Sequence, residues 1–387
     1  MLNAAANVIN YVIDMGVSVM LPIVIAIISI AIGIKVGKAV RSGLMLLLKM
    51  TKTVNVDVWN IWHMTFTGAI AYAVTGNFAI GILGVVIHAA ISYKLGDLWA
   101  PILTDYFELD GLTSPHGTSA YMAPFACMVD WVIDRIPGLN KIDLTADTLQ
   151  EKVGVLAEPV VIGGILGTVI GFLAGYDAQG ALPLGIKMSA VMVLMPKIVK
   201  CIMEGLMPLT ERAKELMNAK FNGAEFYIGL DPAILLGDPT VVSAGLIFIP
   251  LTLLFAVILP GNTVLPFGDL ATIGFFIAIA VGVHKGNLFR SLISGSVIMI
   301  VTLLITNQTV AWTTQLAVST GSAQVGSVVA AMDQGGCPIT YIFTNLFTQE
   351  NIFGMILVAA VYVVCMVFAV LHSKKRAAEQ AAEDTEF

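Results

Sequence analysis

Long apolar runs, separated by short polar stretches, are the dominant pattern of this sequence. Several runs come close to the roughly 20 apolar residues that a helix needs to cross a bilayer. With the mixed segments between Val54 and Ile133, the pattern predicts an all-α polytopic membrane protein with about seven to nine crossings and some re-entrant pieces. The predicted spans are Val17 to Ile34, Val155 to Phe172, Ala181 to Met203, Val241 to Leu259, Leu292 to Ile305 and Phe353 to Leu371.

Two segments on either side of the span Val241 to Leu259 break the helical pattern. Phe226 to Asp238 and Pro260 to Phe276 are rich in glycine and proline, so neither predicts a continuous helix. They carry Asp231 and Asp269 among apolar residues. Within a bilayer, irregular backbone is tolerated only where it is buried in protein or lines a wet cavity. We therefore expect these broken helices to hold a polar substrate.

Composition supports the same class. Of 387 residues, 57% are hydrophobic and 12% are charged, whereas about 25% of the residues in soluble domains are charged. The formal net charge of -6 comes without a basic face, which argues against a nucleic-acid partner. The four cysteines form no CxxC pair, and the histidines and aspartates show no metal-ligand spacing. We therefore expect neither a disulfide framework nor a bound metal.

Basic clusters set the expected topology. Lys35, Lys38 and Arg41 follow the first span, and 374–376 is a basic cluster after the last one. The positive-inside rule then places the C-terminus in the cytoplasm. We predict a single membrane domain over 1–387, with related halves 1–175 and 181–371 and a cytoplasmic tail 372–387.

A short repeat is the sequence evidence for two related halves. The motif P-x-G-x-x-A occurs at 115–120 and again at 266–271, the second copy lying within the broken segment Pro260 to Phe276. Many membrane transporters are built from such internal repeats. Chance is the alternative explanation for three matches in six positions.

Polar side chains inside apolar segments are the candidates for a substrate site. His63 and Thr67 are four residues apart, on one face of a predicted helix. His116 and Thr118 belong to a Pro-His-Gly turn before an apolar run, a pattern shared by loop tips that enter a cavity and by ordinary loops. The aspartates of the broken segments are assigned a function, because a buried acid costs several kcal/mol unless polar groups surround it.

Other polar positions have simpler explanations. His88 has no polar neighbour in sequence, and we interpret it as a packed, hydrogen-bonded histidine and not as a ligand. Glu158 precedes Pro159 and is explained by a helix start or an interfacial position. The sequence has no GxxxxGK[ST] phosphate loop, which excludes a P-loop ATPase, and it has no GxSxG or HExxH motif.

Several longer motifs carry a resemblance to a known family. They are VNVDVWNIWHMTFTGA (54–69), GVVIHAA (84–90), PHGTSAYMAP (115–124), FYIGLDPAILLGDPTVVSAGLIFIPLT (226–252), PGNTVLPFGDLATIGFF (260–276) and MDQGGCPIT (332–340). In these runs the chain resembles the galactitol-specific IIC component of the bacterial phosphotransferase system, a family grouped with the ascorbate permeases. The resemblance extends from about Tyr11 to Leu371.

The resemblance implies a permease of the bacterial inner membrane that takes up galactitol or a similar polyol. It would present the polyol to a soluble B component, whose phosphocysteine donates the phosphoryl group. The chain would then be the membrane component of a phosphotransferase complex, with soluble A and B components as partners and without a cofactor of its own. Relatives of this kind imply a homodimer in the lipid bilayer.

The resemblance also implies roles for individual residues. A polyol offers only hydroxyl groups, so a site in which His, Asp and Thr pair donors with acceptors suits it. A hydroxyl that attacks phosphorus must lose its proton, and we assign the base role to Asp231, with His63 and His116 orienting hydroxyls. The expected substrate-binding residues are His63, Thr67, His116, Thr118, Asp231, Asp269 and Thr272.

The sequence departs from the family pattern at one place that bears on activity. Relatives have some tens of further residues after the position of Gly43, including a Gly-rich segment and an apolar span. Here Gly43 is followed directly by the residues that come after this segment in relatives. The missing part resembles a cavity-lining segment. Three hypotheses stay open: a phosphotransferase-coupled permease, a secondary transporter in which Asp231 and Asp269 carry a proton or cation, and an internally deleted paralogue that does not transport.

Overall fold

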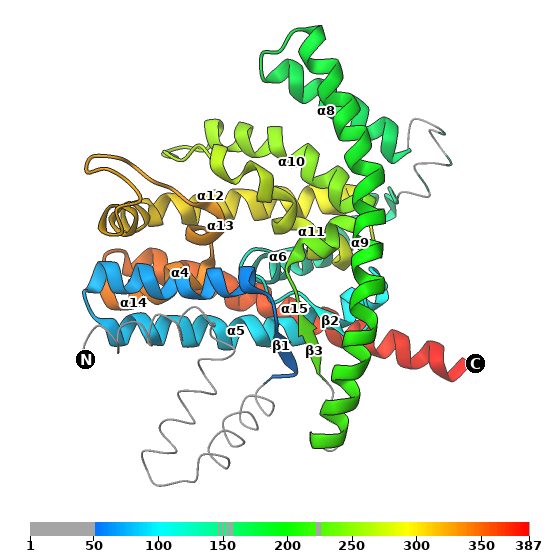
Figure 1. Ribbon diagram of the computed structural model, residues 1–387, viewed down its shortest axis with the longest axis horizontal. Coiled ribbons are helices and arrows are strands. Elements are labelled where there is room, and N and C mark those ends of the chain that lie inside the picture. The colour runs from blue at the N-terminus through cyan, green and yellow to red at the C-terminus, as the bar shows by residue number, and fades with distance from the viewer. Residues whose placement is uncertain are drawn as a thin grey trace.

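Helices make up most of the chain that the structure describes, as predicted for the all-α class (Figure 1). The computed structural model describes residues 51–145, 148, 151, 154, 158–221 and 226–386. The predicted span Val17 to Ile34 and the departure at Gly43 lie outside these residues. The helices are α4 (Val58–Thr75), α5 (Phe78–Asp105), α6 (Ser119–Ile133), α8 (Pro159–Leu173), α9 (Ala178–Phe221), α10 (Pro239–Ile258), α11 (Ile273–Val283), α12 (Leu288–Ser319), α13 (Met332–Gly335), α14 (Pro338–Thr348) and α15 (Ile352–Glu386), with the 3-10 turns η1 (Leu139–Lys141), η3 (Pro232–Gly237) and η4 (Phe267–Thr272).

Four of the described helices are long and apolar enough to cross a membrane. They are α5, α10, α12 and the part of α15 from Ile352 to Arg376. Shorter apolar helices include α6, most of α8, the first part of α9, and η4 together with α11. The predicted polytopic membrane fold is confirmed, whereas the number of crossings and the two related halves remain predictions.

Helix α12 is longer than the predicted span Leu292 to Ile305 because threonine hydroxyls bond back to its own backbone. Thr302 donates to the Ile298 carbonyl (2.7 Å), and Thr306 donates to the Thr302 carbonyl (2.7 Å). Thr313 likewise donates to the Thr309 carbonyl (3.0 Å). A hydroxyl satisfied in this way can be buried in the membrane interior. The Thr-rich sequence therefore continues as a buried helix face.

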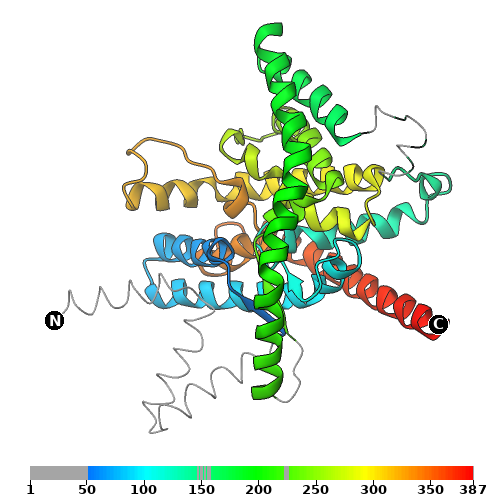
Figure 2. The ribbon, with the colours of Figure 1, turned by 45° about the vertical axis from the view of Figure 1, so that its right-hand side comes forward.

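Helix α9 joins two segments that the sequence pattern separates. The predicted span Ala181 to Met203 and the predicted surface helix Glu204 to Lys220 form one helix of 44 residues. Figures 1 and 2 show α9 crossing the direction of the other long helices, with α8 folded back along its upper part. Gly163 faces Met192 and Gly171 faces Ala181, so α8 and α9 are antiparallel and in close contact, as small residues allow.

One end of the molecule carries a cluster of charges. At this end α6 and α11 terminate and α12 begins. His284 Nδ1 lies 3.0 Å from Asp130 Oδ1, and Arg290 donates to Asp130 (2.6 Å) and to Asp134 (2.8 Å). We call this end, together with the basic cluster 374–376 of α15, the basic end.

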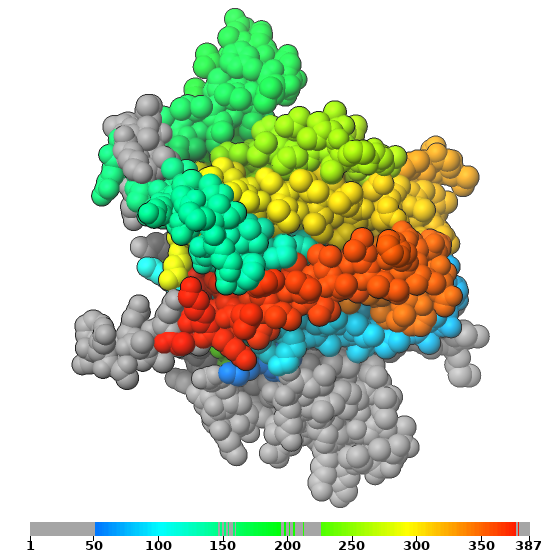
Figure 3. Space-filling model, turned by 180° about the vertical axis from the view of Figure 1, so that it is seen from behind, coloured from blue at the N-terminus to red at the C-terminus, as the bar shows by residue number. Residues whose placement is uncertain are grey.

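The opposite end is formed by the C-termini of α4 and α14. The Gln315 side chain of α12 donates to the Ala73 carbonyl of α4 (2.7 Å), and Trp312 donates to Glu350 just beyond α14 (2.8 Å). Among the described helices, α5, α10, α12 and α15 run between the two ends. On the face in Figure 3, α14 and α15 lie between α12 and α5. Short helices thus approach the middle of the molecule from both ends.

A small parallel sheet lies where these short helices begin. Its strands are β1 (Thr53–Asn55), β2 (Leu112–Thr113) and β3 (Tyr227–Gly229), in the order β1-β3-β2. Asn55 and Thr113 both align with Gly229 in the central strand. Pro115 packs where a Cβ on Gly229 would stand, 2.9 Å from that position, so the sheet needs glycine there. This sheet is absent from the sequence-based prediction.

Candidate functional site

Three loops leave the small sheet at the carboxyl ends of its strands. Parallel strands point the same way, so their carboxyl ends lie together and the residues after them meet. Asp57 follows β1, His116 follows β2 and Asp231 follows β3. Two acids and an imidazole from distant parts of the chain are thereby brought to one place.

Asp231 lies in irregular backbone between β3 and η3, as predicted. Its Oδ1 accepts a hydrogen bond from the Ala233 N–H (2.8 Å), and its own N–H donates to Asp57 Oδ2 (3.2 Å). Burial raises the pKa of the Asp231 carboxyl to about 6; the negative charge of Asp57 adds to the rise and the Ala233 N–H opposes it. The carboxyl is therefore a stronger base than an ordinary aspartate and still ionised at neutral pH.

His116 is buried and faces Asp231. The Thr118 backbone N–H donates to His116 Nδ1 (3.3 Å), and the Thr118 hydroxyl lies 2.8 Å from the same nitrogen. A backbone N–H can only donate, so Nδ1 is the acceptor and Nε2 carries the proton. Nε2 is 3.5 Å from Asp231 Oδ2. Burial lowers the pKa of His116, so its neutral ring presents an N–H toward the carboxylate.

His63 of α4 completes this group. Its ring meets the His116 ring edge-on, with 4.2 Å between the centroids. Gly117 lies directly against it, since a Cβ at Gly117 would be 2.5 Å from His63 Cγ and Nδ1. Among the described residues, no group hydrogen-bonds to His63 Nδ1, although this atom is buried. We call His63, His116, Asp231 and Asp57 the central polar group.

The second broken segment reaches the central polar group through α13. Asp269 accepts hydrogen bonds from the Met332 N–H (3.0 Å) and the Asp333 N–H (3.4 Å), and the Asp333 backbone lies beside His63. Burial and the neighbouring Asp269 carboxylate raise the pKa of Asp333. The Thr272 hydroxyl donates to the Asp269 carbonyl (2.9 Å). Asp269 thus supports the turn behind His63.

Helix N-termini surround the central polar group. Helix α4 begins after Asp57, α6 begins after Thr118, and Phe275 in the first turn of α11 has its ring 6.0 Å from the His116 ring. Helix α14 follows α13 directly and packs against α4. The positive ends of these helix dipoles therefore point toward the centre, where they favour oxygen-rich groups.

Thr67 belongs to a separate polar cluster. Its hydroxyl lies 2.7 Å from His88 Nδ1 and 2.6 Å from the Thr340 hydroxyl, which ties α4 to α5 and α14. His88 is buried and hydrogen-bonded, as predicted for a packed histidine. The roles of Thr67 and Thr272 as substrate contacts remain predictions, because both hydroxyls already have partners within the chain.

Sequence reasoning missed two acids around the site, Asp57 and Asp333. Asp57 caps α4, accepting the Trp59 N–H at 2.9 Å, so an acid just before a helical run was the available signal. Asp333 stands in the MDQGG turn after a polar stretch, and sequence pattern alone does not place that turn beside α4. In the described part of the chain, no cluster of three His, Cys, Asp or Glu side chains is arranged to hold a metal ion.

A cavity of about 450 Å³ lies between α4, the last turns of α12 and the loop that leads to α13. Trp62 and Gln334 border it, and they adjoin His63 and Asp333 in sequence. Its other walls are mainly apolar, with threonine and serine hydroxyls among them. The cavity is on the side of the central polar group that lies away from the basic end.

Polar residues on broken helices, enclosed by membrane-spanning ones, define a multi-pass membrane permease. Residues 44–327 match the model of the family described as "PTS system sugar-specific permease component", where PTS is the phosphotransferase system. The chain belongs to this family, which confirms the resemblance noted in the sequence.

Individual relatives agree with this assignment. The chain is 56% identical over 338 residues to the "PTS system galactitol-specific EIIC component" of Escherichia coli K12, covering 87% of this chain and 74% of that protein. The protein of the same description from E. coli O157:H7 gives the same values. A "Putative permease IIC component" of E. coli K12 is 39% identical over 282 residues, covering 73% of this chain and 64% of that protein.

Proposed function

We propose that this chain is the inner-membrane permease of a galactitol phosphotransferase system and that the central polar group binds the polyol. The observation that carries the proposal is the meeting of His63, His116 and Asp231 where three parallel strands end. The 56% identity to galactitol-specific components supports the choice of polyol.

The chemistry of the central polar group suits a polyol that is to be phosphorylated. His116 offers an N–H and Asp231 offers a carboxylate oxygen, so a hydroxyl between them can accept one hydrogen bond and donate another. When that hydroxyl oxygen attacks the phosphorus of a phosphocysteine, the P–S bond breaks and the cysteine leaves as a thiolate. The hydroxyl proton passes to Asp231, which is why its raised pKa matters.

The partners follow from the same proposal. Soluble A and B components supply the phosphoryl group, and the basic end with the C-terminus faces the cytoplasm by the positive-inside rule. The chain works as a homodimer, as the family resemblance implies. Cross-linking of single-cysteine variants in native membranes tests the dimer, and only monomers at every position would contradict it.

The 450 Å³ cavity is then the entry path for the polyol, and filling it should block uptake. Ala317 lines this cavity, so Ala317→Trp is expected to lower galactitol uptake by membrane vesicles at least about tenfold by steric exclusion. Ala311 is exposed on the same helix and does not line the cavity, so Ala311→Trp is the matched control. Uptake by Ala317→Trp at the wild-type rate would remove the cavity from the path.

Activity should fall at acid pH because Asp231 must be ionised to accept a proton. With its pKa raised to about 6, phosphorylation is expected to decline as the pH drops through that value. Asp57→Asn removes the neighbouring negative charge but keeps a good helix cap, so it should move the midpoint to lower pH. Rates of both proteins with the same A and B components provide the measurement. Identical midpoints would contradict the base role.

A second candidate function is proton-coupled transport of unmodified polyol. The observation in its favour is the Asp269 and Asp333 pair, in which a raised pKa lets Asp333 hold a proton. Vesicles loaded with or without the A and B components separate the functions. Phosphorylated galactitol that appears only with both components supports the permease, free accumulated galactitol supports the second function, and neither product indicates the internally deleted paralogue.

A further inference from the structure

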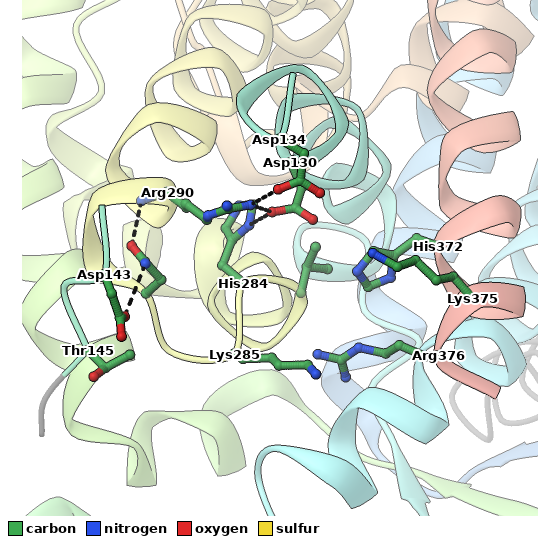
Figure 4. Close-up of a pocket in the computed structure, with 12 residues that line it drawn as sticks. Asp130, Asp134, Asp143, Thr145, His284, Lys285, Arg290, His372, Lys375 and Arg376 are labelled. Atoms are coloured by element: carbon green, nitrogen blue, oxygen red, sulfur yellow. Dashed lines mark hydrogen bonds and ion pairs between the residues drawn. The ribbon is translucent and has the colours of Figure 1, made fainter. Parts of the chain in front are cut away.

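A second cavity, of about 280 Å³, opens at the basic end, far from the central polar group (Figure 4). It lies between the end of α6, the turn from α11 to α12, and the last part of α15. Its volume is just below the roughly 300–1,000 Å³ of pockets that take drug-sized ligands. The cavity therefore suits a small group and not a long chain.

The charged side chains on one side of this cavity already form ion pairs that connect α6 to the turn between α11 and α12 and to the start of α12. Arg290 bridges Asp130 and Asp134, and His284 contacts Asp130 through Nδ1 and the Ser294 hydroxyl through Nε2 (2.9 Å). Figure 4 shows these groups gathered on the side of α6. Opposite charges meet there at hydrogen-bond distance, so this side has no need of a further ion.

The other side of the cavity presents cations. Lys285 comes from the turn between α11 and α12, and Lys375 and Arg376 come from α15. In Figure 4 the Lys285 and Arg376 side chains extend toward one another, whereas the lining aspartates lie elsewhere. A phosphate group held between two such cations would be attracted by both positive charges.

Arg376 is fixed in place for such a role. Its side chain is 7% exposed, one guanidinium nitrogen donates to the Gly282 carbonyl (3.0 Å), and another lies 3.7 Å from Asp105. Lys285 has a left-handed backbone conformation (φ 51°), which the turn imposes at some cost to a residue that is not glycine. Both have further contacts within the chain, so an anion would be an additional partner.

We propose that this cavity binds a phosphate group through Lys285, Lys375 and Arg376. An arginine fork and lysine ammonium groups are the usual protein partners of phosphate oxygens. The phosphate can belong to a small soluble ester or to the headgroup of an anionic lipid. The inference does not depend on the proposed transport function, because it concerns a different cavity and a property measurable without transport.

Titration calorimetry of the purified full chain in neutral detergent, with inorganic phosphate as the probe, tests the soluble source. Lys285→Gln and, separately, Lys375→Gln are expected to weaken phosphate binding about tenfold, because each removes a positive charge that would contact the phosphate. Lys374→Gln is the matched control, because Lys374 neighbours Lys375 but does not line the cavity. This variant should bind phosphate like the wild type.

Nanodiscs test the lipid source. If a lipid headgroup is the ligand, phosphatidylglycerol discs should raise the melting temperature above that in phosphatidylcholine discs, and Lys285→Gln and Lys375→Gln should lose this difference. Either result supports a phosphate site and identifies its source. The proposal is overturned if neither probe binds, or if Lys374→Gln weakens binding as much as the two cavity variants do.

Discussion

Asp231→Asn is expected to abolish galactitol phosphorylation while the protein still inserts into the membrane. The amide can still accept the Ala233 N–H, so the local turn should survive. It cannot take the hydroxyl proton, and loss of a general base costs about 10²–10⁴-fold in rate. Phosphorylation in vesicles supplied with A and B components measures the effect.

Asp177→Asn is the matched control for this substitution. Asp177 is an exposed acid that also caps a helix, accepting the Gly180 N–H at 2.9 Å, but it lies in the turn between α8 and α9. Asparagine is an equally good cap, so this variant should phosphorylate galactitol at the wild-type rate. Normal turnover by Asp231→Asn would remove Asp231 from the mechanism.

Gly117→Ala should impair the site as strongly, through geometry and not through charge. The new Cβ would lie 2.5 Å from two atoms of the His63 ring, a distance that real contacts do not reach. Either His63 or the turn that carries His116 must then move. Displacement of binding groups by about 1 Å can cost 10²-fold in activity, so we expect galactitol uptake to fall by about that factor.

Gly268→Ala separates this effect from a general one. Gly268 occupies the equivalent place in the repeated P-x-G-x-x-A motif, and a Cβ there meets no atom within 4 Å. This variant should keep wild-type uptake and expression. Equal loss in both variants, or normal uptake by Gly117→Ala, would show that the contact between Gly117 and His63 does not shape the site.

The sequence was informative where physical chemistry acts locally. The apolar run Val241 to Leu259 closely predicts α10, because a bilayer-length apolar stretch has few other structures open to it. The broken segments were equally clear, since Gly and Pro disfavour helix wherever the chain goes next. Asp231 and Asp269 stood out because acids in such segments need polar surroundings.

What the sequence did not reveal depends on long-range pairing. Strands β1, β2 and β3 have only two or three residues each, too few for the alternating pattern by which strands are detected. Their parallel pairing nevertheless decides which residues meet, because it brings Asp57 to Asp231. Without that pairing, Asp57 is an ordinary helix cap.

The residues predicted for the site lie together only in part, for the same reason. His63, His116 and Asp231 come together as expected, whereas Thr67 turns toward His88 although it shares a helix face with His63. Helical spacing fixes which face a residue is on but not which neighbours reach that face. Of the two partners of Thr67, His88 comes from α5 and Thr340 from α14, far along the chain.

A structure of the full chain determined with galactitol tests the central claim most directly. The account predicts density for the polyol within hydrogen-bond distance of His63, His116 and Asp231, and no such density in the Asp231→Asn protein. Galactitol bound elsewhere in the wild-type protein, with packed side chains or lipid between these three residues, would contradict it.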